Sequence, residues 1–354
     1  MDLELSDEQT WLSEAVDTLL AREADGDRLW TSLVEFGALS VGGDEGLGAV
    51  ELCLIARALG AHLAPLPYVG SAAVRFAAEA DLADDAVALA VLEPGSSWAA
   101  APETRLETAV RGVAQAPAAA RLEAPVGGLT VTGRKVAVEH AGAVARLAVV
   151  AAAGDGPALA VVDASGVSSV AQPAFDPTAP AYAVELAGAP VVAGPFGGEA
   201  VRRMTTIATL LAAAEAVGAA GRMLDDACRY AAERRQFGQT IGSFQALRHL
   251  LADMYVRQAS SWSSVLYAAA ALDEDAAEAP RTVSIAKAYV SRAAREVAHG
   301  AIQVFGGIAV TAEHPAHRFL RRIAVRERQF GDAVHHEREL GRALASTAVL
   351  EGVR

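Results

Sequence analysis

The leading candidate for a catalytic base in this sequence is the carboxylate of Glu215. It lies within the apolar stretch Leu210–Val217, whose residue spacing predicts a helix. An apolar setting raises the pKa of a carboxyl group, and a raised pKa suits a general base that works near neutral pH. The same position also suits a buried carboxylate paired with an arginine, and the sequence favours this second interpretation.

Three other acidic side chains are candidates for a base. Asp332 follows a glycine directly before a predicted helix, so we expect it to cap that helix. Asp253 lies four residues after His249, a spacing more typical of a solvated or interhelical pair than of a catalytic dyad. Glu327 lies in an arginine-rich helical stretch. None of the three forms a recognisable catalytic arrangement.

Two further motifs combine charge, amide groups and glycine. Arg234, Gln236 and Phe237 stand before a glycine at a corner between two predicted helices, and Gln303 precedes the glycine pair 306–307. The simple interpretation of Arg234 is a residue that satisfies the last carbonyl groups of a helix. For the glycine pair it is an ordinary helix C-cap.

Helices and strands must position these groups. Helical spacing begins after Ser6 and continues near 29–36 and 49–59, before prolines 65 and 67 interrupt it. Short β-branched runs between 85 and 200 predict an antiparallel barrel or sandwich. The helical period then returns, with expected helices over 199–232, 242–272, 276–304, 313–328 and 332–350. We therefore predict an α+β, mostly α protein with a helical N-terminal domain (1–82), a β middle domain (83–197) and a C-terminal four- to five-helix bundle (198–354).

Composition excludes several classes of function. The chain has 354 residues and a net charge of −13, which argues against nonspecific nucleic-acid binding. Its basic residues are arginines except for Lys135 and Lys287, as a GC-rich genome would give. The histidines do not cluster at metal-ligand spacing, so we expect no metal site. The acidic start and the absence of an apolar run of about 18 residues predict no signal peptide and no membrane span, and hence a cytoplasmic protein.

The two motifs together resemble those of the flavin-dependent acyl-CoA dehydrogenases. The first is the Arg-x-Gln-Phe-Gly corner at 234–238, and the second runs through 303–307 as Gln-Val-Phe-Gly-Gly. Thr-Ala-Glu-His-Pro (311–315) and the arginine pair 321–322 follow in the family's order. The resemblance covers nearly the whole chain and implies the same three-part fold, FAD as cofactor and an acyl-CoA substrate.

The resemblance also implies roles for individual residues. In the family, the corner reaches the flavin dinucleotide held by a second subunit. Arg234 would then pair with the pyrophosphate, and Gln236 and Phe237 would hold the adenosine half. The second motif would contribute Gln303, Gly306 and Gly307, since missing side chains let the backbone approach a cofactor.

Several positions depart from the family pattern. The two usual positions of the catalytic base are occupied by Phe330 and Ala208, and neither side chain can accept a proton. A hydroxyl residue that touches the flavin ring is replaced by Leu92, and the strand that packs on the ring has Ala137 where the family has tryptophan. An arginine that meets CoA phosphates aligns with Thr209.

These departures all affect the site that a subunit builds for its own flavin and substrate. The preferred interpretation is therefore a base-less subunit of a mixed tetrameric acyl-CoA dehydrogenase. Such a flavoprotein would act in lipid or steroid catabolism on a bulky acyl group and pass electrons to an electron-transfer acceptor. One alternative is a self-sufficient homotetramer in which Glu215 is an atypical base. Another is a binding or scaffold homologue without flavin.

Overall fold

The structure is a computed structural model that describes residues 4–22, 26–41, 46–78, 82–98, 102–108, 128–154 and 156–352. Contacts within the chain define two compact units. The helical unit comprises Met1–Ser32, Gly48–Ala64 and Thr209–Arg354, and the sheet unit comprises Leu33–Leu47 and Pro65–Ala208. The consecutive three-domain division remains a prediction from sequence.

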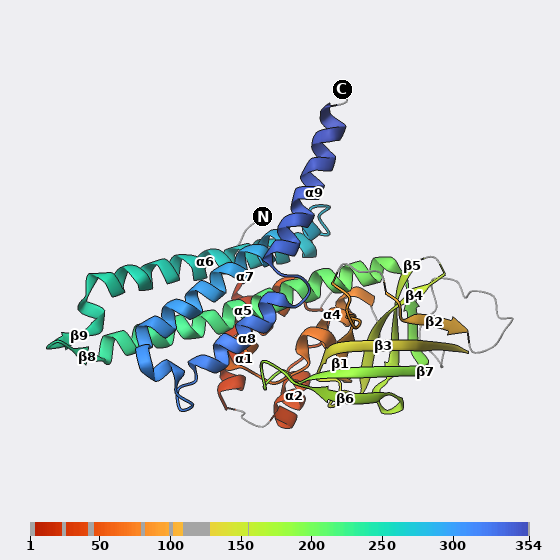
Figure 1. The fold of residues 1–354 in the computed structure, drawn as a ribbon, viewed down its shortest axis with the longest axis horizontal. Coiled ribbons are helices and arrows are strands. Elements are labelled where there is room, and N and C mark those ends of the chain that lie inside the picture. The colour runs from red at the N-terminus through yellow and green to blue at the C-terminus, as the bar shows by residue number, and fades with distance from the viewer. Residues whose placement is uncertain are drawn as a thin grey trace. The chain divides into compact units, whose positions relative to one another are not determined.

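The helical unit is built around the long helix α5 (Figure 1). Its helices are α1 (Asp7–Arg22), α3 (Ala49–His62), α5 (Gly198–Glu233, from residue 209 on), α6 (Gln245–Asp273), α7 (Ala279–Phe305), α8 (Ala316–Arg328) and α9 (Ala333–Gly352). Helix α1 packs on α3 and buries Leu12, Val16 and Leu20, which recur at helical spacing as the sequence predicts. Helices α6 and α7 pack against each other, and α7 also contacts α8 and α9.

Helices α3 and α5 cross at backbone contact distance, and two glycines allow this. A Cβ atom placed on Gly60 would lie 2.0 Å from the carbonyl oxygen of Glu215, and one placed on Gly218 would lie 1.8 Å from that of Arg57. Any side chain at either position would force the helices apart. Helix α3 therefore lies directly beside the segment of α5 that contains Glu215.

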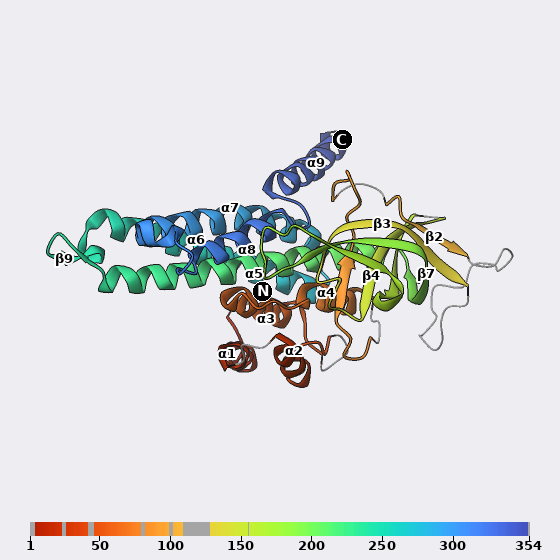
Figure 2. The same cartoon turned by 60° about the horizontal axis from the view of Figure 1, so that its bottom comes forward.

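The start of α3 is capped by a side chain from the end of α6. The carboxylate of Asp273 accepts hydrogen bonds from the backbone N–H groups of Ala49 (2.5 Å) and Val50 (3.1 Å). Helix N-termini leave such donors unsatisfied and carry a partial positive charge, so a carboxylate stabilises them. This cap fixes α3 to α6, although the two segments lie far apart in sequence (Figure 2).

The sheet unit contains the helix α4 (Tyr68–Ala78) and a seven-stranded sheet. Its strands are β1 (Val87–Ala90), β2 (Arg105–Thr108), β3 (Leu129–Glu139), β4 (Arg146–Ala153), β5 (Gly156–Asp163), β6 (Ser168–Gln172) and β7 (Ala181–Phe196). The strand order is β1-β4-β2-β3-β7-β5, and an added β4–β5 pairing returns the path to β4. The sheet therefore curls into the expected barrel around a core of small apolar side chains.

Two features of the sheet unit differ from the sequence prediction. Strands β1 and β2 pair with β4 in parallel, whereas the alternating runs predicted antiparallel pairing. Parallel neighbours need a long connection, and β1 reaches β4 only after more than fifty intervening residues, so short turns could not signal this pairing. Helix α4 is also additional, since it begins directly after the prolines that interrupt the helical pattern.

Helix α5 is the one described helix that is long and apolar enough to cross a membrane. Within the structure, however, 89% of its apolar window is buried. A core helix has the same composition, so the finding is weak evidence for a span.

The close crossing of α3 and α5 generates a first prediction. Gly218→Ala should lower the free energy of unfolding by about 1–3 kcal/mol, because the new methyl group meets the backbone of α3. Urea denaturation would measure this change. Gly341→Ala in α9 is the matched control, since its Cβ has nothing within 4 Å and alanine there should stabilise by roughly 0.5–1 kcal/mol. Equal effects of the two substitutions would contradict the crossing.

Candidate functional site

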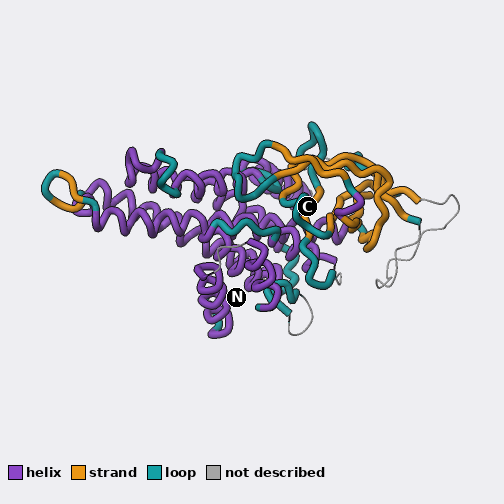
Figure 3. Tube along the Cα trace, turned by 90° about the horizontal axis from the view of Figure 1, so that it is seen from below, coloured by secondary structure: helices purple, strands orange, loops and turns teal. Residues whose placement is uncertain are grey.

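The first sequence motif forms a tight hairpin at the end of α5. The N–H group of Arg234 closes the last turn of the helix by donating to Tyr230 (2.8 Å), and β8 (Arg235–Gln236) then pairs with β9 (Gln239–Thr240). The two turn residues, Phe237 and Gly238, both have left-handed backbone angles (φ 52° and 82°), as a two-residue hairpin requires. Figure 3 shows this hairpin in orange at one end of the helices.

The hairpin presents its functional side chains to solvent. Arg234 and Gln236 are exposed, and Phe237 is 91% exposed. The ring of Phe237 stands edge-on to that of Phe244, with the two ring centroids 6.2 Å apart. The guanidinium of Arg235 instead donates back to the carbonyl of Gly238 (3.1 Å). The two adjacent arginines therefore differ, because Arg235 braces the hairpin and Arg234 makes no side-chain hydrogen bond within the described chain.

The second motif follows the last turn of α7. Gly306 has φ 67° and donates its N–H to the carbonyl of Ile302, so helix capping alone explains a glycine there. Capping does not explain Gly307, which has no left-handed backbone angle and whose Cβ, if it had one, would have no atom within 4 Å. Gln303, Gly306 and Gly307 are all exposed. The open space beside Gly307 suits the close approach of a group from outside the chain.

One aromatic cluster brings the two motifs to the same end of the helical unit. Phe305 is 5% exposed and packs edge-on against Tyr230 of α5, with ring centroids 5.6 Å apart. The ring of Phe305 also contacts that of His314, with the two ring centroids 4.5 Å apart. The hairpin after α5 and the glycine turn after α7 therefore start from neighbouring helix ends.

A shallow cavity lies at the root of the hairpin. Its volume is about 360 Å³, and its lining residues are Cys228, Ala231, Ala232, Thr240, Gly242, Ser243, Arg248 and Leu251. The polar lining comes mainly from the segment after the hairpin, where Arg248 donates to the carbonyl of Gly242 (2.9 Å). Polar groups thus continue from the exposed motif toward α6.

Glu215 has the structure of a paired carboxylate rather than a base. It is 4% exposed and accepts hydrogen bonds from Arg326 of α8 (2.8 Å) and from Arg322, which are themselves almost fully buried. Burial alone would raise the pKa of Glu215, but the charges and hydrogen bonds of Arg326 and Arg322 hold it below the ordinary value. The carboxylate is therefore ionised and both its oxygens are bonded, which leaves it a weak proton acceptor.

The two positions where the family usually has its catalytic base contain buried apolar side chains. Phe330 is 4% exposed in the turn between α8 and α9, where it and Gly331 have left-handed backbone angles (φ 59° and 101°). Ala208 is fully buried in α5. Asp332 caps α9 by accepting the N–H of His335 (2.8 Å), which is the structural role expected from sequence.

The other acidic candidates also have structural settings. Glu327 pairs with Arg295 at 2.8 Å. Asp253 and His249 both lie on the exposed side of α6. No group of three or more histidine, cysteine or acidic side chains able to hold a metal ion occurs among the residues that the structure describes.

In the sheet unit, the segments that correspond to the family's flavin-ring contacts are adjacent. The carbonyl of Leu92 accepts the N–H of Val136 (2.9 Å), which places it beside the start of the Ala137 segment. Lys135 anchors the arrangement by donating to Glu93 (2.7 Å) and to the carbonyl of Val91 (3.1 Å). The two segments thus lie side by side, but leucine and alanine offer neither a hydroxyl group nor an indole ring.

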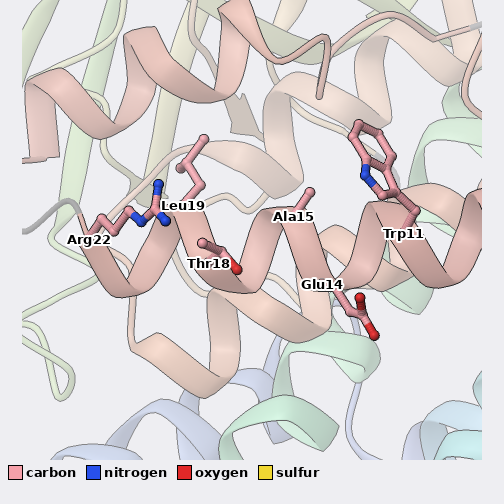
Figure 4. Close-up of a pocket in the computed structure, with 6 residues that line it drawn as sticks. All are labelled: Trp11, Glu14, Ala15, Thr18, Leu19 and Arg22. Atoms are coloured by element: carbon pink, nitrogen blue, oxygen red, sulfur yellow. The ribbon is translucent and has the colours of Figure 1, made fainter.

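A larger cavity, of about 460 Å³, lies along the outer face of α1 (Figure 4). Its described lining comes from α1 alone, as Trp11, Glu14, Ala15, Thr18, Leu19 and Arg22. It is an open groove on one helix, and no polar groups from other described elements converge on it. It therefore provides no arrangement for catalysis.

Comparison with known proteins identifies the family. A family model described as "Acyl-CoA dehydrogenase, C-terminal domain" matches residues 197–344. Acyl-CoA dehydrogenase FadE27 of Mycobacterium tuberculosis is 31% identical over 336 residues, which cover 90% of this chain and 88% of FadE27. The chain belongs to the acyl-CoA dehydrogenase family. Membership assigns to it the FAD cofactor and the oxidoreductase class of that family.

Other similarities differ in extent. Acyl-CoA dehydrogenase IpdE2 of Mycolicibacterium smegmatis is 42% identical over 115 residues, which cover only 32% of this chain and 35% of IpdE2. The ChsE4–ChsE5 complex from M. tuberculosis contains a chain with 26% identity and a TM-score of 0.82, covering 98% of this chain and 99% of that one. The Tcur3481–Tcur3483 steroid acyl-CoA dehydrogenase gives the same identity and TM-score, covering 97% and 99%. The predicted fold and family are confirmed.

The sequence did not single out the groups that hold the Phe330 turn. Lys287 and His336 are both buried beside it, 1% and 6% exposed. The one available sequence signal was the rarity of lysine, since Lys135 and Lys287 are the only two lysines of the chain, and the structure shows that both are buried. A lysine can lose its proton when buried far more readily than an arginine can.

The Glu215 pair generates a second prediction. Glu215→Gln should lower the free energy of unfolding by about 3–5 kcal/mol, because two buried guanidinium groups lose their counter-charge. Since its pKa is lowered, the stabilisation from Glu215 is present above the ordinary carboxyl pKa and is lost as the pH falls through the folded-state value. Glu339→Gln is the control, because its pair with Arg342 is largely exposed and should contribute at most about 1 kcal/mol. Chemical denaturation of the two variants checks this, and similar losses would show that Glu215 is not the anchor.

Proposed function

We propose that this chain is the base-less subunit of a mixed acyl-CoA dehydrogenase and supplies half of an FAD site to a catalytic partner. The observation that carries the proposal is the exposed pair of motifs at one end of the helical unit, combined with a phenylalanine at the base position. Packing within the described chain does not explain the bare backbone at Gly307 or the exposed ring of Phe237, and a cofactor contact at these two positions would explain both. The chain's own segment at the family's flavin-ring position, by contrast, has leucine and alanine side chains at 92 and 137, which offer no hydroxyl group and no indole ring.

The residues present fit the dinucleotide half of FAD. Arg234 would hold the pyrophosphate through a charge-assisted fork, Gln236 and Phe237 would contact the adenosine, and the backbone at Gly306 and Gly307 would approach the cofactor with Gln303 beside it. When bound, FAD supplies the acceptor for the hydride that leaves the β-carbon of an acyl-CoA thioester. In this proposal the partner provides the carboxylate that removes the α-proton, because Phe330 and Ala208 cannot.

The relatives support a two-chain enzyme and suggest its substrate class. Both solved structures reported above are named as pairs of proteins, and one is named a steroid acyl-CoA dehydrogenase. We therefore propose a bulky acyl-CoA, such as one with a steroid side chain, as the substrate of the mixed complex. Electrons would leave the flavin for an electron-transfer acceptor, and the complex would work in the cytoplasm.

Exposed apolar side chains support assembly through α6 and α7. Tyr255, Val256 and Tyr267 of α6 and Ile285 and Tyr289 of α7 are each at least 40% exposed. Met254 of α6 is not part of this set, because it is buried and packs inside the unit against Gly300. We propose a tetramer that covers the exposed set, since apolar groups gathered on adjacent helices mark interfaces.

The self-sufficient alternative has little support, because Glu215 is committed to two arginines. The scaffold alternative differs from the other two functions in that the protein would bind no FAD, so FAD content alone distinguishes it. A single co-expression experiment therefore distinguishes the three functions.

In that experiment, the chain is purified alone and with candidate dehydrogenase subunits from the same genome, and FAD and mass are measured. We expect a colourless chain alone and a yellow tetramer with its partner. Full FAD in the chain alone would support the homotetramer, and no FAD in any combination would support the scaffold. Phe330→Glu is a useful second variant, because restoring one carboxylate should not create activity in the chain alone.

The hairpin arginines give the sharpest test of the FAD contacts. Arg234→Ala in the mixed complex should weaken FAD binding by roughly ten- to a hundredfold, the equivalent of a charged hydrogen bond of about 1.5–3 kcal/mol. Arg235→Ala is the matched control, since its guanidinium is directed to Gly238 within the hairpin. FAD titration of both apo-complexes measures the difference. Equal affinities for the two variants would refute the role given to Arg234.

A further inference from the structure

The turn that joins α8 to α9 is held by polar groups of α7 and by a buried histidine of α9. Lys287 of α7 donates from Nζ to the carbonyl of Arg326, and Ser291, one turn further along α7, donates to that of Glu327 (3.5 Å). Both carbonyls belong to the last turn of α8, where acceptors lack helical partners. Helix α7 thus caps the helix that leads into the turn.

His336 of α9 holds the other side of the same turn. Its Nε2 lies 3.1 Å from the carbonyl oxygen of Phe330, a distance at which the ring nitrogen must donate. Its Nδ1 is buried and has no hydrogen-bond partner in the described part of the chain. A Cβ at Gly331 would lie 3.0 Å from Nε2, so the turn and the imidazole are fitted closely.

The charges around these two groups favour their neutral forms. Burial and the nearby charge of Arg326 lower the pKa of Lys287 to about 7, against the opposing effects of Glu327 and Asp332. Burial and the charges of Lys287 and His335 lower the pKa of His336 to about 4, against Asp332 and the hydrogen bond to Phe330. A proton on either group is therefore more stable when the group reaches water.

We propose that Lys287 and His336 form a proton-controlled clasp on the turn 329–332, which keeps the turn closed when both are neutral and releases it when they are protonated. The clasp concerns the same turn in which the family places its base, but it does not depend on the FAD proposal. Release would free Phe330 and the first turn of α9 together, because His336 connects them.

The sign of the pH effect follows from linkage. The folded pKa of Lys287 lies below its ordinary value of 10.5, so the closed turn loses stability relative to the open one as the pH falls from 10.5 toward 7. For His336 the corresponding window runs from its ordinary 6.5 down to about 4. Both groups therefore favour opening at lower pH, in two separate ranges.

Amide hydrogen exchange in the intact chain tests the clasp. The probes are the N–H groups of Gly331 and His336, which donate to the carbonyls of Arg328 and Asp332. After correction for intrinsic exchange, their protection should fall about fifteenfold between pH 8.5 and pH 7, the change expected for an amine that shifts from 10.5 to about 7. Lys287→Met should abolish this response, whereas protection independent of pH in the wild-type chain would overturn the proposal.

Two controls separate the clasp from general destabilisation. Lys135→Met removes the other buried lysine, which lies in the sheet unit, and should leave the pH response of the turn unchanged. His335→Asn changes the half-buried neighbour of His336, and the loss of amide protection between pH 8.5 and pH 7 should remain, because it depends on Lys287. If Lys287→Met fails to fold, NMR titration of the wild-type lysine side chains decides. A resonance of Lys287 that titrates near 7 supports the clasp, and one near 10.5 overturns it.

Discussion

The shared carboxylate of Glu215 is the interaction on which the helical unit depends most. It is the negative charge shared by two arginines that are 1% and 2% exposed, and an unpaired guanidinium in such a place would cost several kcal/mol. The pair also fixes geometry. Arg322 donates to the carbonyl of Ala64 (3.4 Å) as well as to Glu215, so the end of α3, the middle of α5 and one face of α8 meet at a single point. The glycines at the α3–α5 crossing permit this meeting by removing side chains from between the backbones.

The position of the Phe330 turn follows from that centre. Arg326 links Glu215 to the turn, because its guanidinium also donates to Gln329 (2.6 Å) while its carbonyl accepts from Lys287. A residue at position 330 is therefore placed by charges and hydrogen bonds from several helices. The chain has kept this support while the residue at the position is a phenylalanine, which has no group that can take a proton. In this chain, the support of the turn therefore does not depend on a carboxylate at position 330.

The exposed end of the helical unit shows the opposite pattern. There the described supporting contacts include the aromatic contact of Phe305 with Tyr230 and the internal hydrogen bond of Arg235, whereas the side chains proposed to contact FAD are exposed. The proposed division of labour between two chains would account for both patterns, since one chain would supply the dinucleotide contacts and another the base. The exposed aromatic side chains of α6 and α7 provide a surface through which such chains could associate.

Much of this arrangement was available from the sequence. Helical spacing placed α5 to α9 to within a few residues, because long runs of helix-forming residues end at glycine, proline or capping residues that can be read locally. The motifs at 234–238 and 303–307 identified the family, and Asp332 was recognisable as a cap from its place before a helix. The roles given to the flavin-binding side chains remain predictions, although the structure brings the two motifs to one end of the helical unit.

Long-range pairing was decided only by the tertiary structure. Sequence left Glu215 open between a base and a paired carboxylate, since the distinction depends on arginines more than a hundred residues away. The parallel pairing of β1 with β4 was hidden for the same reason, as was the cap that Asp273 places on α3. The perturbed groups Lys287 and His336 carry no local signal except the rarity of lysine, because burial and neighbouring charge, which set their pKa values, exist only once the helices have packed.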